Sequence, residues 1–467
     1  YIFDNNASRS FFFNTAAQTL ANSPRFTGAT TLPVQNTPPV STRPFIPDKN
    51  GLYNGANNYG MSENFVTPYA YQLSFSIQRE LPGNFLLDVA WVNRKGRKLF
   101  AQADAAQVMN FKDKQSGQLM FDAFNILQTQ LNNGSAITAQ PWFENQMNKA
   151  LLNNYGGTCQ DFGYSNCAEL AADSFGFYFQ NGSTADLVYS LQSNGYIESN
   201  VGLGTQFGAN VYATNLGKSD YNGMLVSLQK RFSKGLEFDF NYTWSHSLDN
   251  QSSVSNTVYG GVLCDLVNPS SCRGNSDFDI RHLVNVNGIY DVPIGRGRFI
   301  GGNMPKWLDT IVGDWSVSGI FVARSGLALN SRSQVYSTTF FFDNPAILKG
   351  SLADLKGGIH DEGDGIQYFA DPIKALAAFR NPKHGETGSR NIFRGPSFFN
   401  TDLAVSKKIK LPWSENQRLT FRAEAYNVFN SNYFYAPDLD ITSPTFGRIT
   451  RSLTSPREIQ FALRFDF

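Results

Sequence analysis

The stretch that decides the fold is YAYQLSFSIQ at residues 69–78, in which apolar and polar side chains alternate at every step. The same alternation recurs in LEFDFNYTWS at residues 236–245 and in EIQFALRFDF at residues 458–467. Successive side chains of a β-strand point to opposite faces of the sheet, so each stretch predicts a strand with one apolar and one polar face. In the last stretch the apolar side chains are Ile459, Phe461, Leu463, Phe465 and Phe467.

Nine segments of the chain alternate in this way. They cover residues 65–79, 84–97, 219–232, 236–247, 277–290, 313–327, 398–410, 417–429 and 457–467. A soluble β-sandwich also alternates, but its strands are typically about 5 to 6 residues long, whereas about 9 to 11 residues are needed to cross a bilayer at a tilt. The length of the segments therefore favours strands that span a membrane.

The connections between these segments alternate between short and long. Tight turns such as Pro82-Gly83 follow the first, third and seventh segments, whereas long connections, including residues 98–218, follow the second, fourth, sixth and eighth. Residues 291–312 are the exception, because they form a long link on the short side. Outer-membrane barrels have short turns on the inner side and long loops on the outer side. We therefore expect an all-β fold, an antiparallel transmembrane β-barrel whose long loops are extracellular.

The composition excludes other classes of protein. The 467 residues carry 39 Lys and Arg against 38 Asp and Glu, which lacks the basic footprint of a nucleic-acid-binding protein, so we expect no nucleic-acid partner. Aromatic residues make up 14% of the chain and charged residues only 16%, which leaves a large apolar surface for burial or for lipid. No segment approaches the roughly 18 uninterrupted apolar residues of a transmembrane helix. A helical membrane protein is excluded, but a β-barrel is not.

The four cysteines form two local pairs, Cys159 with Cys167 and Cys264 with Cys272, and both pairs lie in connections that we expect to face outward. Zinc sites favour closer cysteine spacing and histidine partners, which this sequence does not supply. The favoured interpretation is two loop disulfides formed in an oxidising compartment, and the alternative is four unrelated thiols.

The rest of the chain divides into two regions. Residues 1–64, rich in Asn, Pro, Thr and Gly, predict an outward loop that leads into the barrel portion at residues 65–467. In the long connection, residues 101–109 and 121–131 lack β-branched runs, so we expect short helices there. The chain begins at Tyr1 without a signal-peptide core, which we interpret as a fragment or a processed product.

No catalytic site can be assembled from the sequence. It lacks G-x-S-x-G, H-E-x-x-H and phosphate-loop motifs, so we expect no enzyme activity and no cofactor. The acidic cluster Asp361, Glu362 and Asp364 lacks the spacing of a calcium loop. A solvated loop is the favoured interpretation of this cluster, and no metal site is predicted.

Two groups of side chains are candidates for contact with a ligand. The polar faces of the strands carry both signs of charge, which predicts a lumen wall in contact with water, with substrate binding as the less favoured alternative. These lumen-facing residues are Glu237, Asp239, Arg422, Glu424, Glu458 and Arg464. The long loops carry aromatic residues suited to stacking on sugars or iron chelates. These are Trp142, Tyr155, Tyr164 and Tyr178.

Several segments together resemble the barrel region of TonB-dependent outer-membrane receptors of the Oar-like kind. They are YQLSFSIQRELP (71–82), YNGMLVSLQKRFS (221–233), FDIRH (278–282), GDWSVSG (313–319), RAEAYNVFN (422–430) and PREIQFALRFDF (456–467). The match covers the strands of nearly the whole chain. The terminal aromatics Phe461, Phe465 and Phe467 resemble the membrane-insertion signature that the barrel-assembly machinery recognises.

The resemblance implies a barrel of about 22 strands around an N-terminal plug, in the bacterial outer membrane. The nine segments would be the last nine strands, and the sequence shows neither the plug nor a TonB box. The implied partners are outer-membrane lipid, the protein's own plug, TonB acting through that plug, and an unknown large nutrient ligand. The implied function is energised uptake of that nutrient. The alternative is a surface adhesion or scaffolding barrel without energised uptake.

Overall fold

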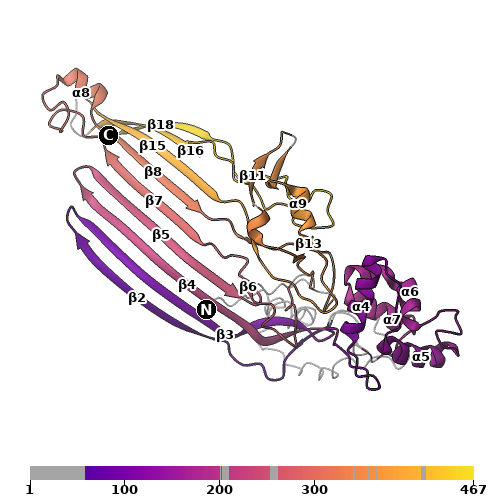
Figure 1. Cartoon of the computed structure of the whole chain (residues 1–467). Helices are drawn as coiled ribbons and strands as arrows, with labels where there is room; N and C mark the ends of the chain where they lie inside the picture. Colours follow the sequence, from indigo (N-terminus) through magenta and orange to yellow (C-terminus); the bar gives the residue numbers. More distant parts are fainter. Residues whose placement is uncertain are drawn as a thin grey trace, which may run out of the picture.

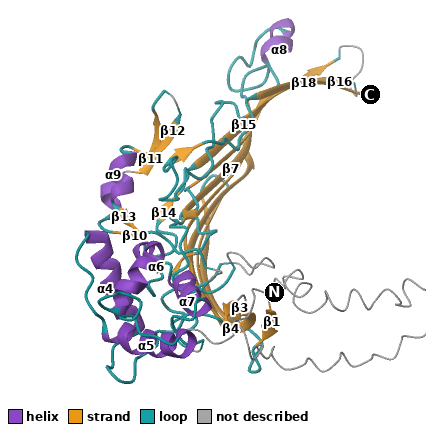
Figure 2. Cartoon of the chain, turned by 90° about the vertical axis from the view of Figure 1, so that its right-hand side faces the viewer, coloured by secondary structure: helices purple, strands orange, loops and turns teal. Residues whose placement is uncertain are grey.

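The computed structural model describes residues 58–199, 201, 210–252, 261–339, 342–355, 357–363, 365–411 and 417–467. Residues 1–57, most of the predicted outward loop, lie outside the described residues, as does Asp364 of the acidic cluster. The described residues form one large curved sheet, with the long connections gathered at one end of its strands (Figures 1 and 2). None of the helices in this part of the chain has the length and apolar character needed to cross a membrane.

Nine long strands follow one another across the sheet in the order β18-β16-β15-β8-β7-β5-β4-β3-β2, and each long strand runs antiparallel to its neighbours. Each predicted segment overlaps one of them. They are β2 (Tyr69–Leu81), β3 (Phe85–Asp104), β4 (Asn210–Ser233), β5 (Leu236–Asp249), β7 (His282–Asp291), β8 (Trp315–Arg324), β15 (Phe398–Lys410), β16 (Arg418–Tyr426) and β18 (Glu458–Asp466). Within the described residues, the outer edges of β2 and β18 pair with no strand, so the sheet is open.

The register of the strands separates an apolar face from a polar face. Phe75 pairs with Trp91, Trp91 with Met224, and Met224 with Trp244, so these four side chains share one face. Residues paired directly across an antiparallel sheet lie on the same side of it, and their neighbours in sequence lie on the other. The apolar face is open to its surroundings, since Phe75 is 62% exposed and Phe461 is 71% exposed. A soluble protein rarely exposes a continuous apolar surface of this extent.

Tight turns join β2 to β3 and β4 to β5 at the end of the sheet away from the long connections. Gly83 and Asn84 have φ angles of 85° and 65° between β2 and β3, and Lys234 and Gly235 have 50° and 80° between β4 and β5. Positive φ at two successive residues gives a turn whose twist matches that of the strands. Glycine is required at position 235 for a second reason, because a Cβ there would lie 2.8 Å from the Asp291 carbonyl oxygen.

The β3–β4 connection contains a small helical module, formed by α4 (Met120–Asn133), α5 (Pro141–Tyr155), α6 (Cys167–Asn181) and α7 (Thr184–Ser193). Its core centres on the fully buried ring of Phe124, which contacts Trp142, Phe143 and Phe179 with ring centroids 5.3 to 5.5 Å apart. The Cys159–Cys167 disulfide joins the link after α5 to the first residue of α6 within this core. The module therefore has a hydrophobic core of its own.

One predicted helix of this connection is present and the other is absent. α4 contains the predicted helical segment 121–131. The prediction of a helix over residues 101–109 is wrong, because β3 continues to Asp104 and pairs Ala101 with Thr214 of β4. Ala101 and Ala103 are fully buried there. Pairing with a distant strand thus outweighs the helical propensity of alanine.

The other long connections contain shorter elements. These are β6 (Gly274–Asn275), β9 (Ala328–Leu329), β10 (Ile347–Leu348), η2 (Leu352–Leu355), β11 (Gly357–Asp361), β12 (Ile366–Phe369), α9 (Pro372–Ala377), β13 (Phe379–Arg380), β14 (Phe393–Arg394) and β17 (Arg448–Ile449). β1 (Asn58–Met61) pairs in parallel with β4. A second apolar cluster forms around Phe369, whose ring stacks on Phe446 at 5.3 Å. This contact joins the β8–β15 connection to the β16–β18 connection.

The long connections are also held to each other by charged and ring contacts. His384 of the β8–β15 connection packs against Phe124 with ring centroids 5.3 Å apart. Arg390 and Arg394 of the same connection form ion pairs with Asp249 and Asp279, whose side chains are 5% and 1% exposed. We call the β3–β4, β5–β7, β8–β15 and β16–β18 connections together the cap. These contacts make the cap one packed structure at one rim of the sheet (Figure 1).

Candidate functional site

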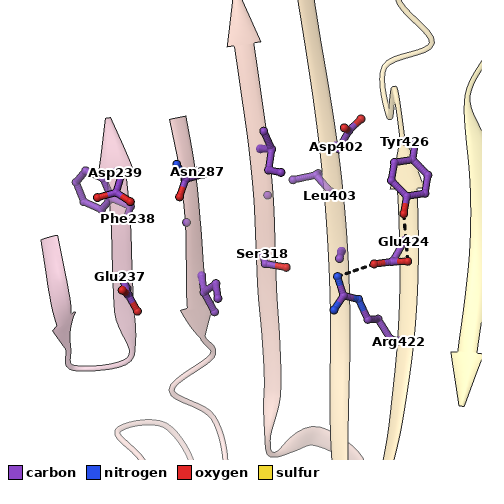
Figure 3. A pocket seen from close by; sticks show the side chains of 15 residues that line it. Glu237, Phe238, Asp239, Asn287, Ser318, Asp402, Leu403, Arg422, Glu424 and Tyr426 are labelled. Carbon is purple, nitrogen blue, oxygen red and sulfur yellow. Dashed lines mark hydrogen bonds and ion pairs between the residues drawn. The ribbon is translucent and has the colours of Figure 1, made fainter. Parts of the chain in front are cut away.

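The polar face of the sheet carries a hollow of about 610 Å³ across five strands, β5, β7, β8, β15 and β16. Its lining includes the carboxylates of Glu237, Asp239, Asp402 and Glu424 and only one cationic group, the Arg422 guanidinium. Figure 3 shows these side chains together with Asn287, Ser318 and Tyr426. Four carboxylates against one guanidinium make the hollow acidic when all of them are ionised.

One side of the hollow is organised around Glu424. Arg422 Nη2 lies 2.5 Å from Glu424 Oε1, and the Tyr426 hydroxyl donates to Glu424 Oε2 at 3.3 Å, as the dashed lines in Figure 3 show. The Gln460 amide of β18 donates to the same carboxylate oxygen. Since Arg422 and Glu424 are two residues apart on one strand, their side chains point to the same face. These contacts fix the Glu424 carboxylate against the wall.

The other carboxylates of the hollow differ in how they are held. Asp402 Oδ1 accepts from the Asn400 amide at 2.9 Å and from the Asn427 backbone N–H at 2.8 Å. For Glu237 and Asp239, the described residues supply no hydrogen-bond or ion-pair partner. These two acids are therefore available to a ligand, to water or to another part of the protein.

The hollow also contains residues that the sequence did not single out. Ile289 pairs with Glu237, and Ile320 pairs with Asn287, so both isoleucines lie on the polar face. They are 49% and 55% exposed. The weaker alternation of β7 and β8 hides them in the sequence, and only the pairing register reveals which face they occupy.

The structure places all six predicted lumen-facing residues on one face of the sheet. Glu458 lies opposite Tyr426, and Arg464 lies opposite Thr420. Arg464 contacts Asp466, with its Nε 2.7 Å from Oδ1, outside the hollow. Phe461 and Phe465 lie on the opposite, apolar face, and Phe467 follows the end of β18 with 93% of its surface exposed.

The four predicted ligand-contacting aromatics of the loops lie in the helical module, and the interpretation of Trp142 is wrong. Its side chain is fully buried against Phe124 and Phe143, because the apolar faces of α4 and α5 close over it. Tyr178 is partly buried against the same core. The Tyr164 hydroxyl donates to Asp173 Oδ2 at 2.6 Å, and this bond raises the pKa of Tyr164. Tyr155 is 56% exposed and remains accessible.

The cysteines form the two predicted local disulfides, Cys159–Cys167 and Cys264–Cys272. Both lie in the cap, and the second pair packs in a small cluster with Ala101 and Ala103 of β3. The part of the chain that the structure describes has no group of three or more His, Cys, Asp or Glu side chains able to hold a metal ion.

The family model of the outer membrane beta barrel domain matches residues 2–460. The chain belongs to this family. It is therefore a protein of the bacterial outer membrane, and the apolar face of its sheet is the face that meets lipid. In an outer-membrane β-barrel the opposite, polar face lines the interior.

Solved structures of outer-membrane proteins match the chain at low identity and low TM-score. The outer membrane transporter YddB from Escherichia coli is 10% identical, with a TM-score of 0.36 over 88% of this chain and 34% of that one. BauA, the ferric preacinetobactin receptor from Acinetobacter baumannii, is 9% identical, with a TM-score of 0.33 over 86% of this chain and 29% of that one. The FrpB iron transporter from Neisseria meningitidis is 9% identical, with a TM-score of 0.31 over 87% and 32%. The chain thus spans about a third of the length of these proteins. No curated protein matches it.

Proposed function

We propose that the chain is the C-terminal barrel portion of an Oar-like TonB-dependent receptor that carries a large nutrient across the outer membrane. The observation that carries the proposal is the acidic hollow on the polar face, which lies opposite a continuous lipid face. A polar wall with several carboxylates suits a water-filled barrel interior in which a ligand passes or binds. It does not suit a closed hydrophobic core. The segments quoted from the strands, which resemble this receptor class, support the same conclusion.

The open edges of the sheet support a barrel larger than nine strands. In hydrocarbon, each unpaired backbone group of an edge strand costs several kcal/mol, so a membrane sheet must close. Bacterial single-chain barrels have even numbers of strands, whereas the part of the chain that the structure describes contributes nine long ones. Additional strands between β2 and β18 would close the barrel and leave a lumen wide enough for a plug. In this proposal, about 22 strands surround that plug, and TonB acts on it.

The cap supports a role in capturing a ligand before it enters the barrel. Its connections are packed together by the ion pairs of Arg390 and Arg394 and by the ring of His384. A packed cap holds a binding surface in a defined shape, as tight recognition requires. No part of this proposed activity is catalytic.

Energised uptake can be tested in cells that carry the full-length protein. Uptake of two probes, an iron-55 chelate and a radiolabelled oligosaccharide, is compared in strains with and without the protein, and with and without TonB. We expect uptake of one probe to require both the protein and TonB. The paired change Glu237→Gln with Asp239→Asn should alter this uptake, whereas Phe240→Leu on the lipid face should not.

The same strains separate transport from the alternative of surface adhesion. Exposed aromatic side chains on the helical module, among them Phe177 at 70% exposure, are the observation that favours adhesion. Adhesion predicts retention of cells on a glycan or protein surface that depends on the protein and is indifferent to TonB. TonB-independent retention without uptake of either probe would contradict the transport proposal.

A further inference from the structure

The β7–β8 connection is a long link at the rim of short turns, and transport gives it no role. It contains α8 (Lys306–Val312) and exposes four large apolar side chains. They are Phe299, Ile300, Trp307 and Ile311, which are 93%, 51%, 67% and 60% exposed. Large apolar side chains gathered in this way mark a contact surface. The connection has no counterpart among the tight turns beside it (Figure 1).

This connection is fastened to the first residues of β8 and to β15. The indole N–H of Trp315 donates to the carbonyl oxygen of Ile311 at 3.1 Å. The ammonium group of Lys407 lies 5.5 Å from the centre of the Trp315 ring and donates to the carbonyl oxygen of Gly313. Lys407 is only 5% exposed as a result. A helix of seven residues is unstable alone, so these contacts hold α8 in place.

These contacts lie on the lipid face of the sheet. The register pairs Trp315 with Lys407, Lys407 with Phe421, and Phe421 with Leu463. Leu463 belongs to the apolar row of β18 and is 68% exposed. The residues that hold the connection in place therefore lie on the face of the sheet that meets the acyl chains.

We infer that the β7–β8 connection is a membrane anchor, whose apolar side chains insert into the phospholipid leaflet at the rim of short turns. This inference goes beyond the proposed transport and depends only on the placement of the sheet in the outer membrane. The exposed apolar side chains contact lipid at the boundary between headgroups and acyl chains. Tryptophan is favoured at this boundary because its ring is apolar and its N–H is polar. Such an anchor fixes the depth of the barrel wall in the bilayer.

The charges of the connection fit phospholipid headgroups. Arg296, Arg298 and Lys306 are interspersed with the apolar side chains. Arg298 Nη2 lies 3.4 Å from Asp314 Oδ1, whereas Arg296 and Lys306 have no ion-pair partner among the described residues. Basic side chains beside an apolar face bind lipid phosphates at a membrane surface. A protein partner would not require this combination at the level of the headgroups.

The anchor is tested with bimane labels on single cysteines in the full-length protein, reconstituted in phosphatidylcholine and phosphatidylglycerol vesicles. Positions Trp307 and Ile311 are compared with Asn303, an exposed polar residue of the same connection. Leu463→Cys serves as the lipid-facing reference. We expect brominated phospholipid to quench the labels at 307 and 311 as it does at 463, with iodide quenching only the label at 303. Quenching of the labels at 307 and 311 by iodide would overturn the inference, because the patch would then face water. Labels at these positions that neither agent quenches would also overturn it, because a protein would then cover the patch.

A second measurement needs no introduced cysteine. Trp307→Phe preserves an apolar ring, so folding is retained, and it should remove part of the tryptophan emission that brominated phospholipid quenches in the wild-type protein. Trp142→Phe is the matched control, because Trp142 is fully buried in the helical module and should contribute nothing to that quenching. Equal lipid quenching in the wild type and in Trp307→Phe would overturn the inference. Transport and its loss do not enter either measurement.

Discussion

His384 should make the stability of the cap depend on pH. Its ring is buried beside the helical module, with Nδ1 3.0 Å from Thr184 Oγ1 and Nε2 3.2 Å from the Phe179 carbonyl oxygen. Burial lowers the pKa of His384 from 6.5 to about 3, because a charged imidazolium would lose its hydration there. In the neutral ring, Nε2–H donates to the carbonyl and Nδ1 accepts from the hydroxyl.

The sign and size of the effect follow from these two pKa values. The unfolded chain takes up a proton at His384 below about pH 6.5, whereas the folded cap resists it until about pH 3. The stabilising contribution is therefore complete above pH 6.5 and is lost as the pH falls toward 3. When the pH falls from about 7.5 to about 5, the free energy of unfolding of the cap decreases by about 2 kcal/mol through His384. Asp186 opposes this loss of stability as the pH falls, because burial raises the pKa of Asp186 from 3.8 to about 6 and the folded cap therefore takes up this proton before the unfolded chain does. This opposing gain is about 1 kcal/mol after solvent screening.

Hydrogen exchange measured by mass spectrometry reports this local stability. Amides of α4 and α6 in the full-length protein are followed at about pH 7.5 and about pH 5, with correction for intrinsic exchange rates. The pH dependence of the wild type should exceed that of His384→Gln by about 2 kcal/mol. Asp186→Asn should increase the loss at low pH by about 1 kcal/mol. An identical pH dependence in the wild type and His384→Gln would refute a buried neutral histidine.

Three other substitutions probe separate parts of the fold. Leu463→Arg on the lipid face should lower the free energy of unfolding in urea by about 2 to 4 kcal/mol, whereas Gln460→Arg on the opposite face should cost less than about 1 kcal/mol; equal costs would contradict the two faces. Arg394→Met leaves the buried Asp279 with a weaker arginine contact at 3.3 Å and should cost about 2 to 3 kcal/mol, measured as faster amide exchange in the β5–β7 connection; unchanged exchange would argue against the ion pair. Cys272→Ser opens a loop with a sequence separation of 8 and should destabilise it by about 2 to 3 kcal/mol, so wild-type resistance to protease would count against this estimate.

The strands could be predicted from the sequence because their signal is local. Alternation in a strand depends only on which face each side chain meets, and a lipid face must be apolar at every second position. β15 spans Phe398–Lys410, the same bounds as its predicted segment. The disulfides were also predictable, since residues close in sequence lie close in any compact loop.

The remaining features depend on contacts between residues that are distant in sequence. Residues 101–104 are a strand because β4 lies beside them, although their composition favours a helix. Trp142 is buried because α4 covers it, and no local pattern distinguishes a core tryptophan from an exposed one. Ile289 and Ile320 lie in the hollow because the register of β7 places them there. His384 becomes part of the helical module only when two connections fold together.

A spin-label scan of β5 tests the central claim, that this sheet spans the outer membrane with one face to lipid and one to water. Labels are placed singly at positions 237 to 244 of the full-length protein in vesicles, and their collisions with oxygen and with a water-soluble nickel chelate are measured. Positions such as Phe238, Phe240 and Tyr242 should favour oxygen, whereas Glu237 and Asp239 should favour the chelate. A uniform profile along the strand, or one with the two sets exchanged, would contradict the account.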